Sequence, residues 1–187
     1  FSANIEGLQA LVPSVSFRKG NTTRNSAITI RGIGTISFSV AAEPSVSTVV
    51  DGVVLGRSGQ AFVDLYDLER IEVLRGPQGT LFGKNASAGV INMTSKRPSE
   101  EFEGVFETTL MQDNEYRLKG RVSGALNDNV NGSLTVLKSQ FDGYIKNVYN
   151  NETTSGYDKE GVRAMLDIDA SGDTDILFIF ETVSSND

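Results

Sequence analysis

The sequence contains no cysteine, no histidine and no tryptophan among its 187 residues. Without cysteine there is no disulfide framework, and without cysteine and histidine the usual zinc sites are excluded. The lack of histidine also removes Ser-His and Cys-His nucleophile pairs and any imidazole general base. Only carboxylate and lysine chemistry remains for an enzyme. We therefore expect a protein that is not an enzyme and that holds no metal and no cofactor.

Long apolar runs are also absent. The longest unbroken aliphatic and aromatic run is 176–180, whereas a membrane helix needs about 18 apolar residues. The opening residues 1–4 have neither the basic start nor the apolar stretch of a signal peptide. The sequence thus predicts neither a helical membrane anchor nor a leader at its first residues.

Proline and charge are distributed unevenly, and the change falls near Pro98. All four prolines lie at or before this residue. Residues 1–98 carry 10 basic and 7 acidic side chains, whereas residues 99–187 carry 7 and 17, so the net charges are +3 and −10. A segment without proline suits continuous strand pairing, because proline removes a backbone donor. We expect two domains, 1–98 and 99–187.

The second half alternates between apolar and polar residues with a period of two, which is typical of β-strands. In these runs the even positions are mostly apolar and carry one charge, Lys138, whereas the odd positions carry most of the charges. Each run has about ten residues, enough for a tilted strand to cross a bilayer. The runs are 102–112, 116–126, 130–141, 162–170 and 176–180.

Two interpretations of these runs remain open: strands of a transmembrane barrel, or a soluble antiparallel sheet with one wet face. Short connections at 113–114, 127–129 and 171–174 contrast with a long polar one at 142–158. Transmembrane barrels have short periplasmic turns and longer outer loops, which favours the barrel and makes the long connection extracellular. Five strands do not close a barrel, since the smallest have about eight.

The first half has an α+β pattern. Apolar spacing predicts short helices at 4–12 and 61–68, and the strand candidates are 27–33, 69–74 and 89–94. Asp51-Gly52 predicts a hairpin within 47–55.

Two motifs that suggest ligand sites are incomplete. The glycine-rich loop 75–89 lacks the first glycine and the Ser/Thr of a phosphate-binding loop, because Gln78 and Asn85 occupy those positions. The calcium-like stretch that starts at Asp169 has Phe180 where the final glutamate belongs. We expect neither nucleotide nor calcium binding, and no nucleic-acid partner.

Several segments resemble TonB-dependent outer-membrane receptors. The most specific is LYDLERIEVLRGPQGTLFGKNASAGVINMTSKRP at 65–98, and ALVPSVSF at 10–17, IRGIG at 30–34 and VVDGV at 49–53 are similar to other parts of the same plug domain. The resemblance implies an α+β plug domain followed by antiparallel strands of a transmembrane β-barrel, which is incomplete in this chain. It also implies that the chain is a fragment.

The resemblance implies a function as well: uptake of a scarce nutrient such as a ferric siderophore across the bacterial outer membrane, with the plug inside the barrel as its gate. The implied partners are TonB, through a segment missing from this chain, a small-molecule or glycan ligand, an iron chelate among the candidates, and outer-membrane lipid. The alternative is a soluble or surface ligand-binding or adhesion module that reuses a plug-like fold.

Candidate site residues follow from the resemblance. Arg31 and Arg75 match plug arginines that pair with glutamates of the barrel wall, although loop arginines exposed to solvent are the competing interpretation. Loops at 34–45, 55–60 and 82–88 fall where a plug faces its ligand, and in the first two we expect Phe38, Glu43 and Arg57 as contacts. Loop tips that only pack against the barrel are the alternative.

Overall fold

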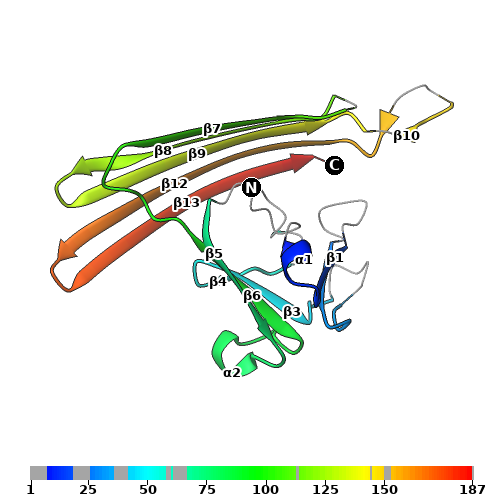
Figure 1. Ribbon diagram of the computed structural model, residues 1–187, viewed down its shortest axis with the longest axis horizontal. Coiled ribbons are helices and arrows are strands. Elements are labelled where there is room, and N and C mark those ends of the chain that lie inside the picture. The colour runs from blue at the N-terminus through cyan, green and yellow to red at the C-terminus, as the bar shows by residue number, and fades with distance from the viewer. Residues whose placement is uncertain are drawn as a thin grey trace. The chain divides into compact units, whose positions relative to one another are not determined.

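The chain folds into two compact units, Phe1–Lys96 and Arg97–Asp187 (Figure 1). Our computed structural model describes residues 8–18, 26–35, 42–57, 60, 67–112, 114–143, 145–149 and 153–186. The break between the units lies two residues before Pro98, where proline and charge change along the sequence. Among the described residues, no helix is long and apolar enough to cross a membrane.

The first unit is built around a four-stranded sheet in the order β4-β3-β6-β5. The inner strands β3 and β6 are parallel, and the two outer pairs are antiparallel. The tight turn between β3 and β4 has positive φ at Asp51 (49°) and Gly52 (82°), which confirms the predicted hairpin. The strands are β3 Val46–Val50, β4 Val53–Val54, β5 Leu68–Arg75 and β6 Gly89–Ser95.

Smaller elements complete this unit: the helices α1 (Leu8–Leu11) and α2 (Gly79–Phe82), and an antiparallel pair of β1 (Val15–Arg18) and β2 (Ala27–Ile30). The predicted strand 27–33 was too long, because Arg31 and Gly32 turn the chain with φ of 53° and 77°. The predicted helix 61–68 is wrong at its end, since Leu68 begins β5, and residues 61–66 lie outside the described part.

The larger of the two apolar clusters in the described part of the first unit joins its two sheets. β-Branched residues dominate it, which suits packing on a pleated surface. Side chains from four strands meet there with almost no exposed surface: Val15, Ile28, Ile30, Val46, Ile91 and Met93. The central strands of the first unit therefore bury their apolar side chains as in a water-soluble domain.

The second unit is a five-stranded antiparallel sheet in the order β13-β12-β9-β8-β7 (Figure 1). The five alternating runs are confirmed as strands, although the fourth starts earlier and the fifth extends further than expected. A small hairpin of β10 (Ile145–Lys146) and β11 (Thr153–Thr154) lies within the long connection. The long strands are β7 Glu103–Leu110, β8 Tyr116–Asn127, β9 Val130–Phe141, β12 Tyr157–Ser171 and β13 Thr174–Asn186.

This sheet exposes its apolar face and buries much of its polar face. Phe106, Val136 and Phe180, at even positions, are 74%, 46% and 63% exposed. Arg121 and Arg163, at odd positions, are 5% and 4% exposed. A water-soluble antiparallel sheet has the reverse arrangement, with the apolar face on the core. The observed polarity is that of a barrel wall with an apolar outer band and a polar interior.

Candidate ligand-binding and ion-pairing sites

Several loops meet at one end of the four-stranded sheet of the first unit, which we call the plug sheet because of the resemblance noted above. The strands β3 and β6 begin there and β5 ends there, because Gly89 is in register with both Val46 and Arg75. Backbone hydrogen bonds tie the loops together: Ala88 N–H donates to Ser45 O at 2.9 Å, and Gly76 N–H to Ala88 O at 3.0 Å. A β-carbon at residue 89 would lie 2.4 Å from Leu74 O, so only glycine fits this crossing.

Glu43 lies at this end and forms an ion pair with Lys84, with 2.7 Å between Oε1 and Nζ. Both side chains are well exposed, at 60% and 68%. A hydrogen bond of 2.7 Å between the hydroxyls of Thr35 and Ser45 lies in the same group of loops. Lys84, in the glycine-rich loop 75–89, thus contacts a carboxylate of another loop. No local sequence pattern indicated this pair, whose members lie 41 residues apart.

Within the described residues, no hydrogen bond or ion pair joins Arg57 to Glu43. Arg57 is exposed, and its backbone N–H donates to Gln60 Oε1 at 3.2 Å. The chain leading to it still runs beside β3, since Leu55 N–H donates to Thr48 O at 2.8 Å. Phe38 lies outside the described residues. The contact of these residues with a ligand stays a prediction.

Arg31 and Arg75 both lie at exposed ends of strands. Arg31 occupies the turn after β2, where its backbone N–H donates to Ser14 O at 2.7 Å, and Arg75 is the last residue of β5. Within the described part of the chain, neither guanidinium forms an ion pair with a carboxylate. Their predicted partners on a barrel wall therefore stay a prediction.

The polar face of the five-stranded sheet carries ion pairs between neighbouring strands. Arg163 contacts Glu181 at 2.7 Å, and the two residues are directly opposite in register. Arg121 contacts Glu103 at 3.5 Å. Both arginine side chains are 4% exposed. The alternation of the sequence placed these residues on one face, but their pairing required the strand register.

The apolar face of the five-stranded sheet becomes polar and charged near the long connection. There Lys138 Nζ donates to Asp158 Oδ1 at 2.7 Å and also to Glu160. All three side chains occupy even positions, because β12 begins at Tyr157 and keeps its alternation through its polar start. The sequence indicated only Lys138, since the polar stretch before residue 162 concealed the beginning of the strand.

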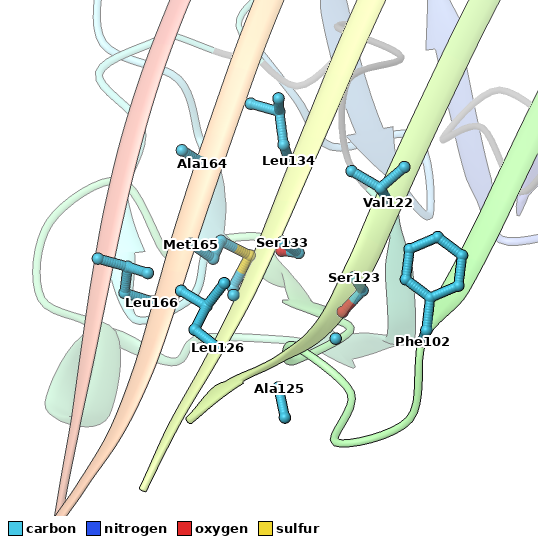
Figure 2. A pocket seen from close by; sticks show the side chains of 12 residues that line it. Phe102, Val122, Ser123, Ala125, Leu126, Ser133, Leu134, Ala164, Met165 and Leu166 are labelled. Carbon is cyan, nitrogen blue, oxygen red and sulfur yellow. The ribbon is translucent and has the colours of Figure 1, made fainter. Parts of the chain in front are cut away.

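A shallow apolar groove of about 420 Å³ opens on the same face nearer the short turns (Figure 2). Its floor is low because Gly124 and Gly132, which are in register on β8 and β9, have no side chains. Larger apolar side chains surround the floor: Phe102, Val122, Leu126, Leu134 and Leu166. The described residues contain no group of three or more side chains suited to hold a metal ion.

The fold and these two surfaces define a class of protein. Residues 2–90 match the family described as the TonB-dependent Receptor Plug Domain. The chain belongs to the TonB-dependent receptors, of which it carries a plug and antiparallel barrel strands. Proteins of this family are outer-membrane receptors and not enzymes, as the sequence predicted.

Individual relatives are named as receptors, among them receptors for pesticin and for ferrioxamine. The chain is 32% identical to the pesticin receptor of Yersinia pestis over 160 residues, which cover 85% of this chain and 23% of that receptor. It is 35% identical to the ferrioxamine receptor of Yersinia enterocolitica over 101 residues, or 51% of this chain and 13% of that receptor. The chain thus spans about a quarter or less of these relatives.

Solved structures of outer-membrane receptors share the fold of this chain. The ferric yersiniabactin uptake receptor FyuA from Yersinia pestis superposes with a TM-score of 0.84 at 28% identity, over 96% of this chain and 28% of that one. The pyoverdine outer membrane receptor FpvA from Pseudomonas aeruginosa has a TM-score of 0.75 at 20% identity, which supports the fold alone.

Proposed function

We propose that the chain is the plug and early barrel wall of a receptor that takes up a ferric siderophore across the outer membrane. The observation that carries the proposal is the combination of a plug fold with a sheet of inverted polarity, apolar outside and ion-paired inside. The names of the relatives support the substrate class, since they include receptors for ferrioxamine, catecholate siderophores and ferric yersiniabactin.

In this proposal the plug lies inside the barrel and gates it. TonB supplies the energy by pairing with a segment of the receptor as an added strand. Phe38, Glu43 and Arg57 contact the ligand, and Arg31 and Arg75 pair with carboxylates of the barrel wall. The exposed Glu43–Lys84 pair supports a binding role for its loops, because exposed charges near one another are available to a polar ligand.

Radioactive iron uptake tests the proposal. The full-length receptor is expressed in a strain that lacks its own siderophore receptors, and cells are supplied with ⁵⁵Fe bound to yersiniabactin, ferrioxamine or a catecholate siderophore. We expect saturable uptake of at least one complex, and its loss on addition of a protonophore or on deletion of TonB. Uptake that is independent of TonB, or no uptake of any ferric complex, would contradict the proposal.

The arginine assignment has its own test in the full-length receptor. Replacing Arg75 with alanine should loosen the plug and lower its melting transition, because a buried carboxylate on the wall would lose its partner. Arg70→Ala is the matched control, since Arg70 lies on the same strand in an exposed pair with Glu72. An unchanged plug transition in the Arg75 variant would refute the assignment.

A further inference from the structure

The segment 97–100 connects the first unit to β7, and we call it the wall strap. It opens the second unit directly after Lys96, and it forms neither helix nor strand. Pro98 within it is nevertheless buried. Connecting segments normally run over the surface of a protein and are mobile. The burial of Pro98 therefore indicates that the wall strap is packed in place and does not act as a loose linker.

Two hydrogen bonds fix the second half of the wall strap to β8. The backbone N–H of Ser99 donates to Ser123 Oγ at 2.8 Å, and the backbone N–H of Ala125 donates to Glu100 O at 3.2 Å. Ser123 is 3% exposed, so its hydroxyl is a buried acceptor. The last register pair of β7 with β8 is at Ser123, and Ala125 lies beyond it. The strap thus continues the attachment to β8 past the end of the β7 ladder.

Arg97 extends the attachment to a second strand. Its carbonyl oxygen accepts from Arg121 Nη2 at 3.3 Å, and its own Nη1 lies 3.3 Å from Asp167 Oδ2. Arg121 lies on β8, whereas Asp167 lies on β12, and β9 separates these two strands. Arg121, Ser123 and Asp167 all occupy odd positions, so the strap is bound on the polar face of the sheet. The strap is therefore attached to β8 and β12 as well as to β7.

The residues just before the strap are held within the first unit. Ser95 donates twice to the carboxylate of Asp51, from its backbone N–H to Oδ1 and from its hydroxyl to Oδ2, both at 2.8 Å. The backbone N–H of Lys96 donates to Asp67 O at 2.7 Å. The contacts of the plug therefore end at Lys96, and the contacts of the wall begin at the next residue, Arg97. The chain has no slack segment at this junction.

We propose that the wall strap is a fixed anchor of the plug: while the plug is moved during uptake, residues 97–100 stay bound to β8 and β12, and the moving part of the chain ends at Lys96. Within the described residues β7 pairs with β8 alone, so a pull on its first residue would open its ladder one pair at a time. The strap bears the pull first, because its contacts precede β7 along the chain. The inference rests on the proposed function only in that the plug is moved during uptake.

An anchored strap and a detachable one differ in the length of chain that a pull on the plug releases. The full-length receptor in a bilayer of phosphatidylethanolamine and phosphatidylglycerol is pulled by its N-terminus with an atomic force microscope. An anchored strap stops the extension at residue 97, whereas a detached one lets it continue to Glu103, where β7 begins. The six residues between these stops span about 20 Å when extended. This length separates the two cases.

Two substitutions remove side-chain contacts of the strap: Ser123→Ala and Asp167→Asn in one double variant. We expect the unaltered receptor to stop at residue 97 and the double variant to stop about 20 Å later. The matched control is Ser133→Ala with Asp169→Asn, on the same face of β9 and β12, and it should stop at residue 97. Within the described residues neither of these side chains forms a hydrogen bond or ion pair with the strap. No stop at residue 97 in the unaltered receptor, or an unshifted stop in the double variant, would overturn the proposal.

A reversible cross-link tests whether the strap stays bound during uptake itself. Ser99→Cys with Ser123→Cys joins the strap to β8, and the chain contains no other cysteine. Ser133→Cys with Met165→Cys is the control, since these register partners on β9 and β12 lie outside the strap. Thiol labelling with a maleimide polymer measures how much cross-link forms. We expect ⁵⁵Fe uptake by the oxidised strap variant to equal that of its reduced form, and the control to behave likewise.

The two measurements separate this inference from the proposed function. Uptake that is lost when the strap is cross-linked and restored by a reducing agent, with the control unaffected, would show that the strap must detach and would refute the anchor alone. The pulling experiment needs no siderophore. A stop at residue 97 that shifts in the double variant, in a receptor without iron uptake, would support the anchor and refute only the proposed function.

Discussion

The central strands of the plug sheet, β3 and β6, bury most of their side chains, and the two half-buried residues of β6, Asn92 and Thr94, are polar. The strands β8, β9 and β12 bury mainly odd residues, among them two arginines, and expose leucine and valine. Both sheets obey the same two-residue alternation of the backbone. Alternation along a strand therefore determines which residues share a face of the sheet. Which of the two faces is buried depends on the surroundings of the sheet.

A core truncation should give the largest difference between the two sheets. Ile91 in β6 has no exposed surface, so Ile91→Ala leaves a cavity and should destabilise the plug by about 3–4 kcal/mol. Val136→Ala in β9 is the matched control, because Val136 is 46% exposed and should change stability by less than about 1 kcal/mol. Chemical denaturation of both variants in the full-length receptor measures this, and equal losses would contradict the difference in burial.

A charge on the exposed apolar face should have the next largest effect. Leu134 is 43% exposed, and in water Leu134→Arg would be nearly neutral. If this face contacts lipid, the same change should cost about 2–3 kcal/mol, since arginine near the bilayer midplane is destabilising. Thr109→Arg, on the polar face of β7, should be close to neutral. Urea-dependent folding into vesicles measures both, and a neutral Leu134 variant would indicate a water-soluble sheet.

The sequence was sufficient to predict structural elements that depend on residues close together in the chain. The alternation of apolar and polar residues predicted the five long strands, because neighbouring residues of a strand point to opposite faces. Asp51-Gly52 predicted a hairpin, and both residues have the positive φ values that its turn requires. The failed prediction at 27–33 had a local signal too, since Arg31-Gly32 is a turn with positive φ. Glycine there could have indicated the end of the strand.

Contacts between distant segments were beyond the sequence. Glu43 meets Lys84 only because β3 and β6 are parallel neighbours, an order that no local pattern specifies. The cluster of Lys138, Asp158 and Glu160 depends on where β12 begins, and its polar start looks like loop. The sequence placed Glu43 and Arg57 in loops, and both are exposed, whereas their contact with a ligand stays a prediction.

The smallest expected difference in stability is between variants that break an ion pair in each of the two sheets. Glu181→Gln should cost about 1–2 kcal/mol, because Arg163 stays buried at 4% exposure while the neutral amide still accepts one hydrogen bond. Glu43→Gln breaks the exposed pair with Lys84 and should cost less than about 0.5 kcal/mol. Denaturation of both variants at low and high salt measures the difference: the Glu43 effect should vanish with salt, and the Glu181 effect should persist because buried pairs are screened less. A larger loss of stability at Glu43 than at Glu181 would contradict this comparison. It would mean that the burial of Arg163 does not make its ion pair more important for stability than the exposed pair of the plug.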